Sequence, residues 1–210
     1  MSGPQATGGR TLKIGITGPI GCGKSTILGW LAERGALVID ADQVTRELMG
    51  PGSAVVASIV AAFGSAVAGP DGSLDRASLA AIVFKDPDQL HRLEAITHPV
   101  IRARILELIA EAESASMPIV ALEAIRLVDG GYPSLLDEVW LVTCNADAQR
   151  ERLAARGLSL EDAAARIEAQ ADLAEHARPV TTRVIDTSGT LAESETAVEG
   201  ALTLAIAGLR

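Results

Sequence analysis

Aromatic residues are scarce in this chain, which has two tryptophans, one tyrosine and two phenylalanines among 210 residues. Hydrophobic residues still make up 48% of the sequence, so a sizeable core must be built from aliphatic side chains and alanine. Basic residues are also in deficit, 18 against 27 acidic ones, which gives a formal net charge of −9. This balance argues against nucleic acid or an anionic membrane surface as the main partner.

Long apolar runs are missing as well. No run approaches the ~18–20 residues that a membrane span needs, and no segment reads as a signal peptide. The cysteines are Cys22 and Cys144. Because a disulfide at Cys22 would cripple the glycine-rich segment around it, we expect free thiols and a reducing cytoplasm. Residues 1–10 are small and polar and predict a disordered tail ahead of a single domain covering 11–210.

The chain is organised around the segment GPIGCGKST, which runs from Gly18 to Thr26. It matches the pattern G-x-x-x-x-G-K-[ST], whose glycines let backbone N–H groups converge on phosphate oxygens. A strand expected at 12–17 precedes it, and a helix expected at 25–33 points its positive end at the same anion. Pro19 is unusual because it has no N–H to donate. The alternative, a chance match in a glycine-rich turn, does not explain the flanking strand and helix.

This loop predicts an ATP site with specific roles for its residues. Lys24 is expected to reach the outer phosphates, and the hydroxyl of Ser25 to ligate Mg²⁺. The residues expected to bind ATP here are Gly21, Cys22, Gly23, Lys24, Ser25 and Thr26.

Five strand-like runs alternate with helical stretches, at 12–17, 37–40, 118–123, 139–144 and 183–186. The middle runs are continuously apolar, as in strands that are buried on both faces. The alternation predicts a P-loop NTPase-type α/β fold, a three-layer sandwich around a five-stranded parallel sheet. Ligands of such sheets bind at the carboxyl ends of the strands.

Two helical regions interrupt this alternation. Residues 50–117 are too many for a simple crossover and predict a helical substrate-side insertion, with a bend where His98-Pro99 interrupts its last helix. An arginine-bearing helical hairpin at about 152–180 predicts a lid that closes over the nucleotide. An ordinary solvated helix surface is the alternative for this hairpin.

Carboxylates follow two of the predicted strands. If the backbone stays extended, Asp40 and Asp42 face the same side and suggest a general base and a metal or substrate orienter. It is equally consistent with the spacing that Asp42 caps the next helix. Arg46, one turn on, faces either a substrate phosphate or solvent. Glu123 fits an orienter of Mg²⁺-bound water, with a helix-capping or salt-bridged glutamate as the alternative.

Six segments between Leu12 and about Ser188 add a family resemblance: IGITGPIGCGKST, VIDADQVTREL, DGSLDRASLAAIVF, LEAITHPVI, DEVWLVT and QRERLAARGLSLEDAAARIEAQ. In this order and spacing the chain resembles the bacterial dephospho-CoA kinases. The resemblance implies transfer of the γ-phosphoryl group of ATP to the ribose 3′-hydroxyl of dephospho-CoA, the last step of CoA synthesis, with ATP and Mg²⁺ as cofactors.

Carried over by position, the resemblance makes Asp42 the base for the acceptor hydroxyl. Asp40, Arg46 and His98 then belong to the acceptor side, and Arg152 reaches the nucleotide from the lid. The expected partner is the small molecule dephospho-CoA, with no nucleic acid and no membrane. The expected form is a cytoplasmic monomer or weak homo-oligomer.

The chain departs from the family pattern at several positions. Pro19 replaces a usual glycine, His176 a common lysine, and Thr187 a usual asparagine. The run 123–129 keeps an acid at each end with the side-chain lengths exchanged, as Glu123 and Asp129. These departures concern acceptor positioning and lid contacts more than ATP binding.

Other functions remain open from the residues themselves. One is another nucleoside or nucleotide kinase of the same fold. Another is a non-catalytic sensor of ATP or CoA, against which the intact Lys24, Ser25 and Asp42 argue. A regulatory GTPase needs an Asn-Lys-x-Asp guanine motif, which the sequence lacks. The run 186–189 fits Asp-x-x-Gly, but it follows the last strand, where no switch would sit.

Overall fold

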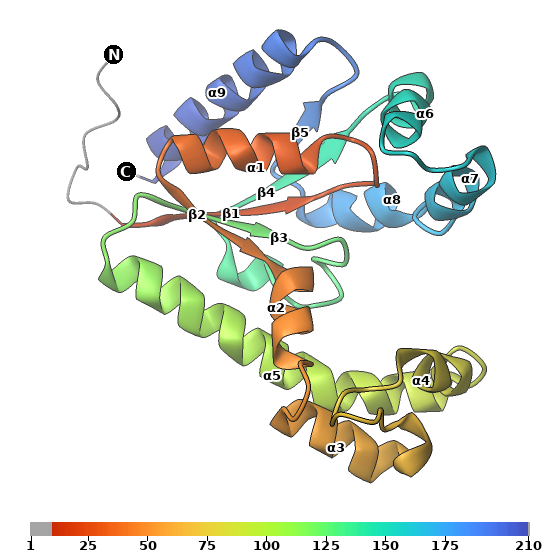
Figure 1. Cartoon of the computed structure of the whole chain (residues 1–210). Coiled ribbons are helices and arrows are strands. Elements are labelled where there is room, and N and C mark those ends of the chain that lie inside the picture. The colour runs from red at the N-terminus through yellow and green to blue at the C-terminus, as the bar shows by residue number, and fades with distance from the viewer. Residues whose placement is uncertain (1–9, 210) are drawn as a thin grey trace. The chain divides into compact units, whose positions relative to one another are not determined.

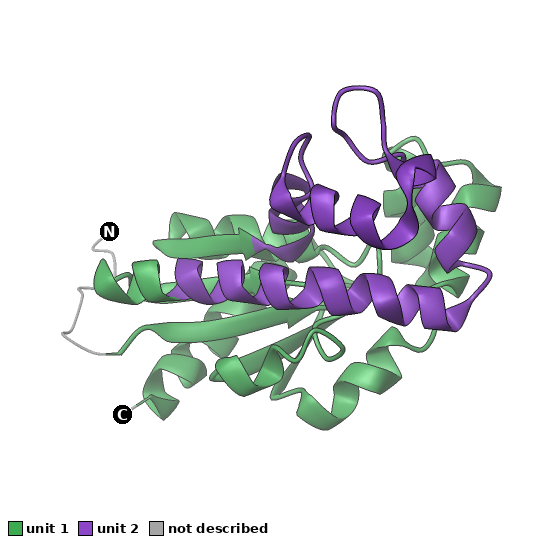
Figure 2. Ribbon diagram, turned by 90° about the horizontal axis from the view of Figure 1, so that it is seen from below, with its two compact units in different colours: residues 1–39, 110–210 green, residues 40–109 purple. Residues whose placement is uncertain are grey.

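The computed structural model describes residues 10–209. The tail predicted for residues 1–10 therefore falls outside the described residues, except for Arg10. The chain divides into two compact units: unit 1 holds the residues up to Ile39 and those from Ala110 onward, and unit 2 holds 40–109 (Figure 2). Each unit is described by itself below.

A five-stranded parallel sheet is the centre of unit 1, in the order β2-β3-β1-β4-β5 (Figure 1). β1 lies between β3 and β4, with Ile14 opposite Ala121 on one side and Glu138 on the other. Two strands have the predicted bounds, two begin one residue away from the predicted start, and β4 is displaced by one residue at both ends, so the predicted P-loop type of α/β fold is confirmed. The strands are β1 (Leu12–Thr17), β2 (Ala36–Asp40), β3 (Ile119–Glu123), β4 (Glu138–Thr143) and β5 (Arg183–Asp186).

Helices α1 and α9 cover one face of this sheet (Figure 1). The core beneath them is aliphatic apart from the fully buried Trp140, as the scarcity of aromatic residues predicts. On the opposite face Leu127 and Leu136 pack so closely over Gly15 that an added Cβ would lie 2.4 Å from Leu136. The helices of unit 1 are α1 (Lys24–Glu33), α6 (Ala146–Ala155), α7 (Leu160–Glu168), α8 (Leu173–Ala177) and α9 (Leu191–Gly208).

Unit 2 is helical and has its own core. Val55, Val56, Ile59, Leu79 and Val83 are its main buried side chains. Its helices are α2 (Ala41–Leu48), α3 (Ala54–Phe63), α4 (Arg76–Val83) and the first part of α5 (Pro87–Ser114), with a 3-10 turn at Ser65–Val67.

Helix α5 runs through Pro99 as one element, so His98-Pro99 does not end the helix, and the bend expected there stays a prediction. A proline removes only one N–H from the ladder of a helix. Ile96 and Ile105, which pack inward on either side of it, keep a helix of this length together. Among the helices of residues 10–209, none is long and apolar enough to cross a bilayer.

Candidate active site

The phosphate loop between β1 and α1 packs closely against β4 and α6 of the same unit. Gly18 has φ +146°, and a Cβ there would lie 2.1 Å from the carbonyl oxygen of Val142 in β4. Gly21 has φ +80°, and a Cβ there would lie 3.1 Å from Leu153 in α6. Glycine is therefore required at both positions, because only a residue without a side chain lets the loop backbone come this close.

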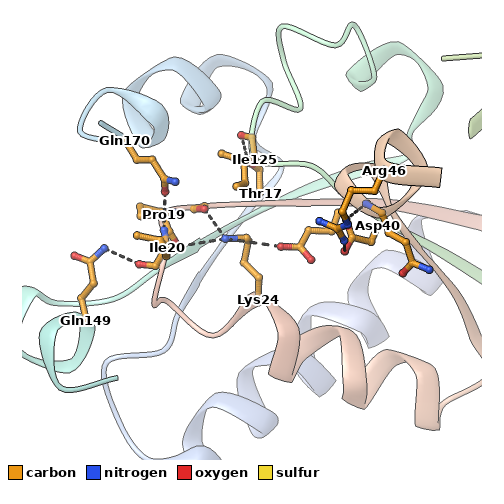
Figure 3. Close-up of polar contacts among 12 residues, drawn as sticks. Thr17, Pro19, Ile20, Lys24, Asp40, Arg46, Ile125, Gln149 and Gln170 are labelled. Carbon is orange, nitrogen blue, oxygen red and sulfur yellow. Dashed lines mark hydrogen bonds and ion pairs between the residues drawn. The ribbon is translucent and has the colours of Figure 1, made fainter. Parts of the chain in front are cut away.

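Lys24 crosses back over the loop from the first residue of α1. Its Nζ donates to the carbonyl oxygens of Gly18 at 2.8 Å and Pro19 at 3.3 Å, and lies 3.8 Å from Oε1 of Glu123 (Figure 3). The side chain is 9% exposed. Glu123 is thus a salt-bridged glutamate, one of the alternatives left open by the sequence, and it stands at the carboxyl end of β3 beside the loop.

Ser25 and Thr26 lie exposed in the first turn of α1, where helix N–H groups point outward. Within residues 10–209 no group of three or more His, Cys, Asp or Glu side chains is arranged to hold a metal. Mg²⁺ in phosphoryl-transfer sites takes one or two protein oxygens, together with substrate phosphates and water. The hydroxyl of Ser25 and the carboxylate of Glu123 are donors of this kind, so the residues present fit a Mg²⁺ ion that arrives with ATP.

Cys22 and Cys144 form a disulfide, so the expectation of free thiols is wrong. Cys22 is buried in the phosphate loop, Cys144 follows β4, and their Cα atoms lie 5.2 Å apart. The bond uses only the side chain of Cys22, whose N–H donates to the carbonyl oxygen of Pro19 at 3.4 Å within the loop. The cysteines therefore give no argument for a reducing compartment.

Arg152 lies beside the same loop. Its guanidinium donates to Oγ1 of Thr187 at 3.0 Å and to the carbonyl oxygen of Thr187 at 2.5 Å. The hydroxyl of Thr187 in turn donates to the carbonyl oxygen of Cys22 at 2.8 Å. The threonine that replaces the family's usual asparagine thus connects an arginine of α6 to the phosphate loop.

Asp40 and Asp42 do not share a side of an extended strand, because α2 begins at Ala41. Asp40 caps this helix and accepts the N–H of Gln43 at 3.0 Å, so the alternative in which Asp42 caps the helix is also wrong. Both aspartates are suitable caps, and the one nearer the strand satisfies the free N–H groups of the first turn. Asp42 lies exposed in that turn.

The other two acceptor-side candidates also belong to unit 2. The guanidinium of Arg46 lies 3.7 Å from the carboxylate of Asp40 and is 60% exposed (Figure 3). His98 lies exposed on α5. Their roles stay predictions.

A cavity of about 250 Å³ opens in unit 1 between the loop after β3 and the segment 169–177. Thr17, Arg126, Asp129 and His176 are among its lining residues. Asp129 accepts a hydrogen bond from Nε of Arg126 at 2.6 Å and pairs with Nε2 of His176 at 2.9 Å. Burial opposes the charged form of Asp129, but the hydrogen bonds and charges of Arg126 and His176 outweigh it and hold its pKa below the usual value. Two positions that depart from the family pattern, 129 and 176, are therefore partners.

Gln149 and Gln170 were not predicted, although both contact the phosphate loop. Nε2 of Gln149 donates to the carbonyl oxygen of Ile20 at 2.7 Å, and the N–H of Ile20 donates to Oε1 of Gln170 at 2.7 Å (Figure 3). A glutamine in a polar helical stretch is typical of an exposed surface. No motif marks these two, and only the burial of Gln149, seen in the fold, sets it apart.

Comparison with known proteins agrees with this geometry. The family model for dephospho-CoA kinase matches residues 12–193. The chain belongs to the dephospho-CoA kinase family. A dephospho-CoA kinase of Symbiobacterium thermophilum is 46% identical over 196 residues, which cover 93% of this chain and 82% of that protein.

Two solved structures are also similar to this chain. TT1252 from Thermus thermophilus is 35% identical, with a TM-score of 0.76 over 96% of this chain and 99% of that one. A dephospho-CoA kinase from Campylobacter jejuni is 25% identical, with a TM-score of 0.67 over 91% of this chain and 95% of that one. The enzymes of this family are transferases that phosphorylate dephospho-CoA with ATP in CoA biosynthesis. The enzyme class predicted from the sequence is confirmed.

Proposed function

We propose that this dephospho-CoA kinase transfers the γ-phosphoryl group of ATP, bound with Mg²⁺, to the ribose 3′-hydroxyl of dephospho-CoA at its phosphate loop. The observation that carries the proposal is the shape of this loop. Gly18 and Gly21 bring its backbone against β4 and α6, and Nζ of Lys24 lies at the carbonyl oxygens where the loop begins.

On the nucleotide side, the contribution of the protein to catalysis is electrostatic. Phosphoryl transfer needs little covalent chemistry from a protein, so catalysis rests on positioning and on the stabilisation of developing charge. In our proposal the loop from Gly21 to Thr26 binds the phosphates, and Lys24 neutralises charge on the transferred group. Ser25 and Glu123 hold Mg²⁺, directly or through water, and Arg152 contacts the nucleotide beside Cys22.

The acceptor side is assigned to unit 2, with Asp42 as the base. Asp40 is already engaged, because it caps α2 and lies near Arg46. Asp42 stands one residue inside the same helix with its carboxylate exposed. Arg46 and His98 assist the acceptor in this assignment. We further propose that the enzyme works in the cytoplasm as a monomer or weak homo-oligomer, with no nucleic acid or membrane as partner.

A coupled ADP-release assay tests the reaction against dephospho-CoA, adenosine, AMP and pantetheine. We expect release with dephospho-CoA and background rates with the other three. Preference for adenosine or AMP would point to the nucleoside or nucleotide kinase alternative. ATP binding without ADP release for any acceptor would point to the sensor.

A pair of asparagine variants tests the base. Asp42→Asn keeps the size of the side chain and removes its basicity, so we expect kcat to fall by about 10²–10⁴, the usual worth of a positioned acid–base group. The ATP KM should change little, because the lost interaction acts mainly in the transition state. Asp40→Asn is the matched control and should cost less in kcat. The opposite order would remove Asp42 as the base while leaving the kinase assignment intact.

A further inference from the structure

The polar groups of Ile20 are held from two sides by glutamine side chains. Its N–H donates to Gln170, and its carbonyl oxygen accepts from Gln149, each at 2.7 Å. An N–H can only donate and a carbonyl can only accept. The backbone therefore fixes the orientation of both amides, so Gln170 presents its oxygen and Gln149 its nitrogen.

These contacts fix two consecutive peptide units of the phosphate loop. The N–H of Ile20 belongs to the same planar unit as the carbonyl of Pro19, and in a trans peptide these two groups point in opposite directions. Holding the N–H toward Gln170 therefore turns the Pro19 carbonyl away from it, toward Nζ of Lys24 at 3.3 Å. Pro19 itself has no N–H with which to fix the unit before it.

Neither of the two glutamines is exposed on the surface. Gln149 is 8% exposed on α6, and its Cγ would lie 3.2 Å from a Cβ placed on Gly21, so the side chain has little room to move. Gln170 follows α7, lies partly buried and also lines the cavity beside Thr17. The predicted lid region is thus attached to the loop at the residue that follows Pro19.

We propose that Gln149 and Gln170 are positioning residues for phosphoryl transfer, acting through the Ile20 peptide groups to preset the loop for ATP and to aim the Pro19 carbonyl at Lys24. This inference rests on the proposed function. A loop that is already held in one shape does not have to be ordered when ATP binds. The two glutamines should therefore raise the catalytic efficiency with ATP and have no effect on the binding of the acceptor.

The test uses two variants at each position. Gln149→Leu and Gln170→Leu remove the hydrogen bonds at similar size, and each should lower kcat/KM for ATP by about 10- to 100-fold, as expected for a misplaced reacting group. The KM for dephospho-CoA should stay as in the wild type. Because both residues hold Ile20, the double variant should lose less than the product of the two single effects.

The glutamate variants separate positioning from packing. A carboxylate at 170 still accepts the N–H of Ile20, whereas a carboxylate at 149 cannot donate to its carbonyl. In the ATP-free protein we therefore expect Gln170→Glu to keep the hydrogen-exchange protection of the phosphate-loop amides and Gln149→Glu to lose it. Glu168→Ala, an exposed change just before Gln170, is the control and should match the wild type.

Two results would overturn the inference. One is leucine variants with wild-type kcat/KM for ATP, and the other is equal loop protection in the two glutamate variants. If a leucine variant does not fold, the glutamate pair still decides, because glutamate has the size of glutamine. Failure of the wild type to release ADP with dephospho-CoA would instead defeat the proposed function, so the two failures are distinguishable.

Discussion

Lys24, the residue that we propose contacts phosphate, is surrounded by oxygen acceptors of the protein itself. A buried ammonium group needs acceptors, and the carbonyls of Gly18 and Pro19 supply them at 2.8 and 3.3 Å. The carboxylate of Glu123, 3.8 Å away, supplies the opposite charge. In the proposed function this lysine would exchange one set of oxygen acceptors for another when phosphate oxygens enter the loop, so it need not be stripped of water at that moment.

Arg152 gives a prediction at the same scale. Arg152→Ala removes a cation that contacts Thr187 beside the phosphate loop, so we expect the ATP KM to rise by about tenfold, the worth of one hydrogen bond to a charged group. Initial rates over a range of ATP concentrations measure the change. Arg150→Ala on the same helix is the control, because that side chain is 63% exposed and pairs with Asp147. An unchanged ATP profile in Arg152→Ala would show that this arginine only supports the structure around Thr187 and does not contact the nucleotide.

At the scale of elements, the sequence predicts best where one physical signal decides. The apolar strands and the loop with its flanking strand and helix are local patterns, and the structure has them within about one residue. The start of α2 was missed because Asp40 and Asp42 are both good caps and local preference cannot choose between them. The helical pattern of α5 was visible on both sides of Pro99, but the sequence could not tell whether the helix continues through the proline, which local preference leaves to the packing of the fold.

The contacts around the phosphate loop could not be predicted for a related reason. Gln149 and Gln170 lie 129 and 150 residues from Ile20 in sequence. Their meeting with its backbone depends on where α6 and the segment after α7 pack. A hydrogen bond to backbone also leaves no characteristic residue at the other end, so no pair of residue types marks it.

The link between the loop after β3 and α8 gives a prediction of pH dependence. The pKa of Asp129 is held below its usual value by Arg126 and His176 in spite of burial. The charged form of Asp129 therefore stabilises the fold fully above the unfolded-state pKa of about 4, and this stabilisation is lost as the pH falls through the lower folded-state pKa. Asp129→Asn should be less stable than wild type near neutral pH, with a difference that shrinks below about pH 4.

Urea unfolding of both proteins across this pH range measures the difference. Asp147→Asn is the control, because the carboxylate of Asp147 is 96% exposed and its loss should matter little at any pH. A difference between Asp129→Asn and wild type that stays constant as the pH falls would show that the charge of Asp129 does not stabilise the fold.

At the scale of the whole molecule, the disulfide is a covalent bond between distant parts of the chain. It joins residues 122 positions apart and encloses all of unit 2, together with β2, β3 and β4. Pairing across such a distance is decided by the fold, which explains why local reasoning about a glycine-rich loop missed it. Constraint of the unfolded chain by a loop of this length is worth about 4–5 kcal/mol in the chain-entropy model.

Reduction should therefore lower the stability of the wild type. We expect a lower urea midpoint in the presence of dithiothreitol, with a loss of up to about 4–5 kcal/mol in the free energy of unfolding. Cys144→Ser should resemble the reduced wild type and should not respond further to the reductant. A wild type that titrates with two reactive thiols as purified, and unfolds identically with and without reductant, would contradict the bond.

The order of the strands has a consequence for folding during synthesis on the ribosome. β1 ends at Thr17, but its two neighbours in the sheet begin only at Ile119 and Glu138. Unit 2 is contiguous, has its own core and is synthesised in between, so its contacts can form first. Until β3 and β4 emerge, the nascent chain carries an apolar strand with both edges open, a state prone to association with other chains. The phosphate loop is thus translated before unit 2, β3 and β4, and it acquires its surroundings in unit 1 only after β3 and β4 have emerged.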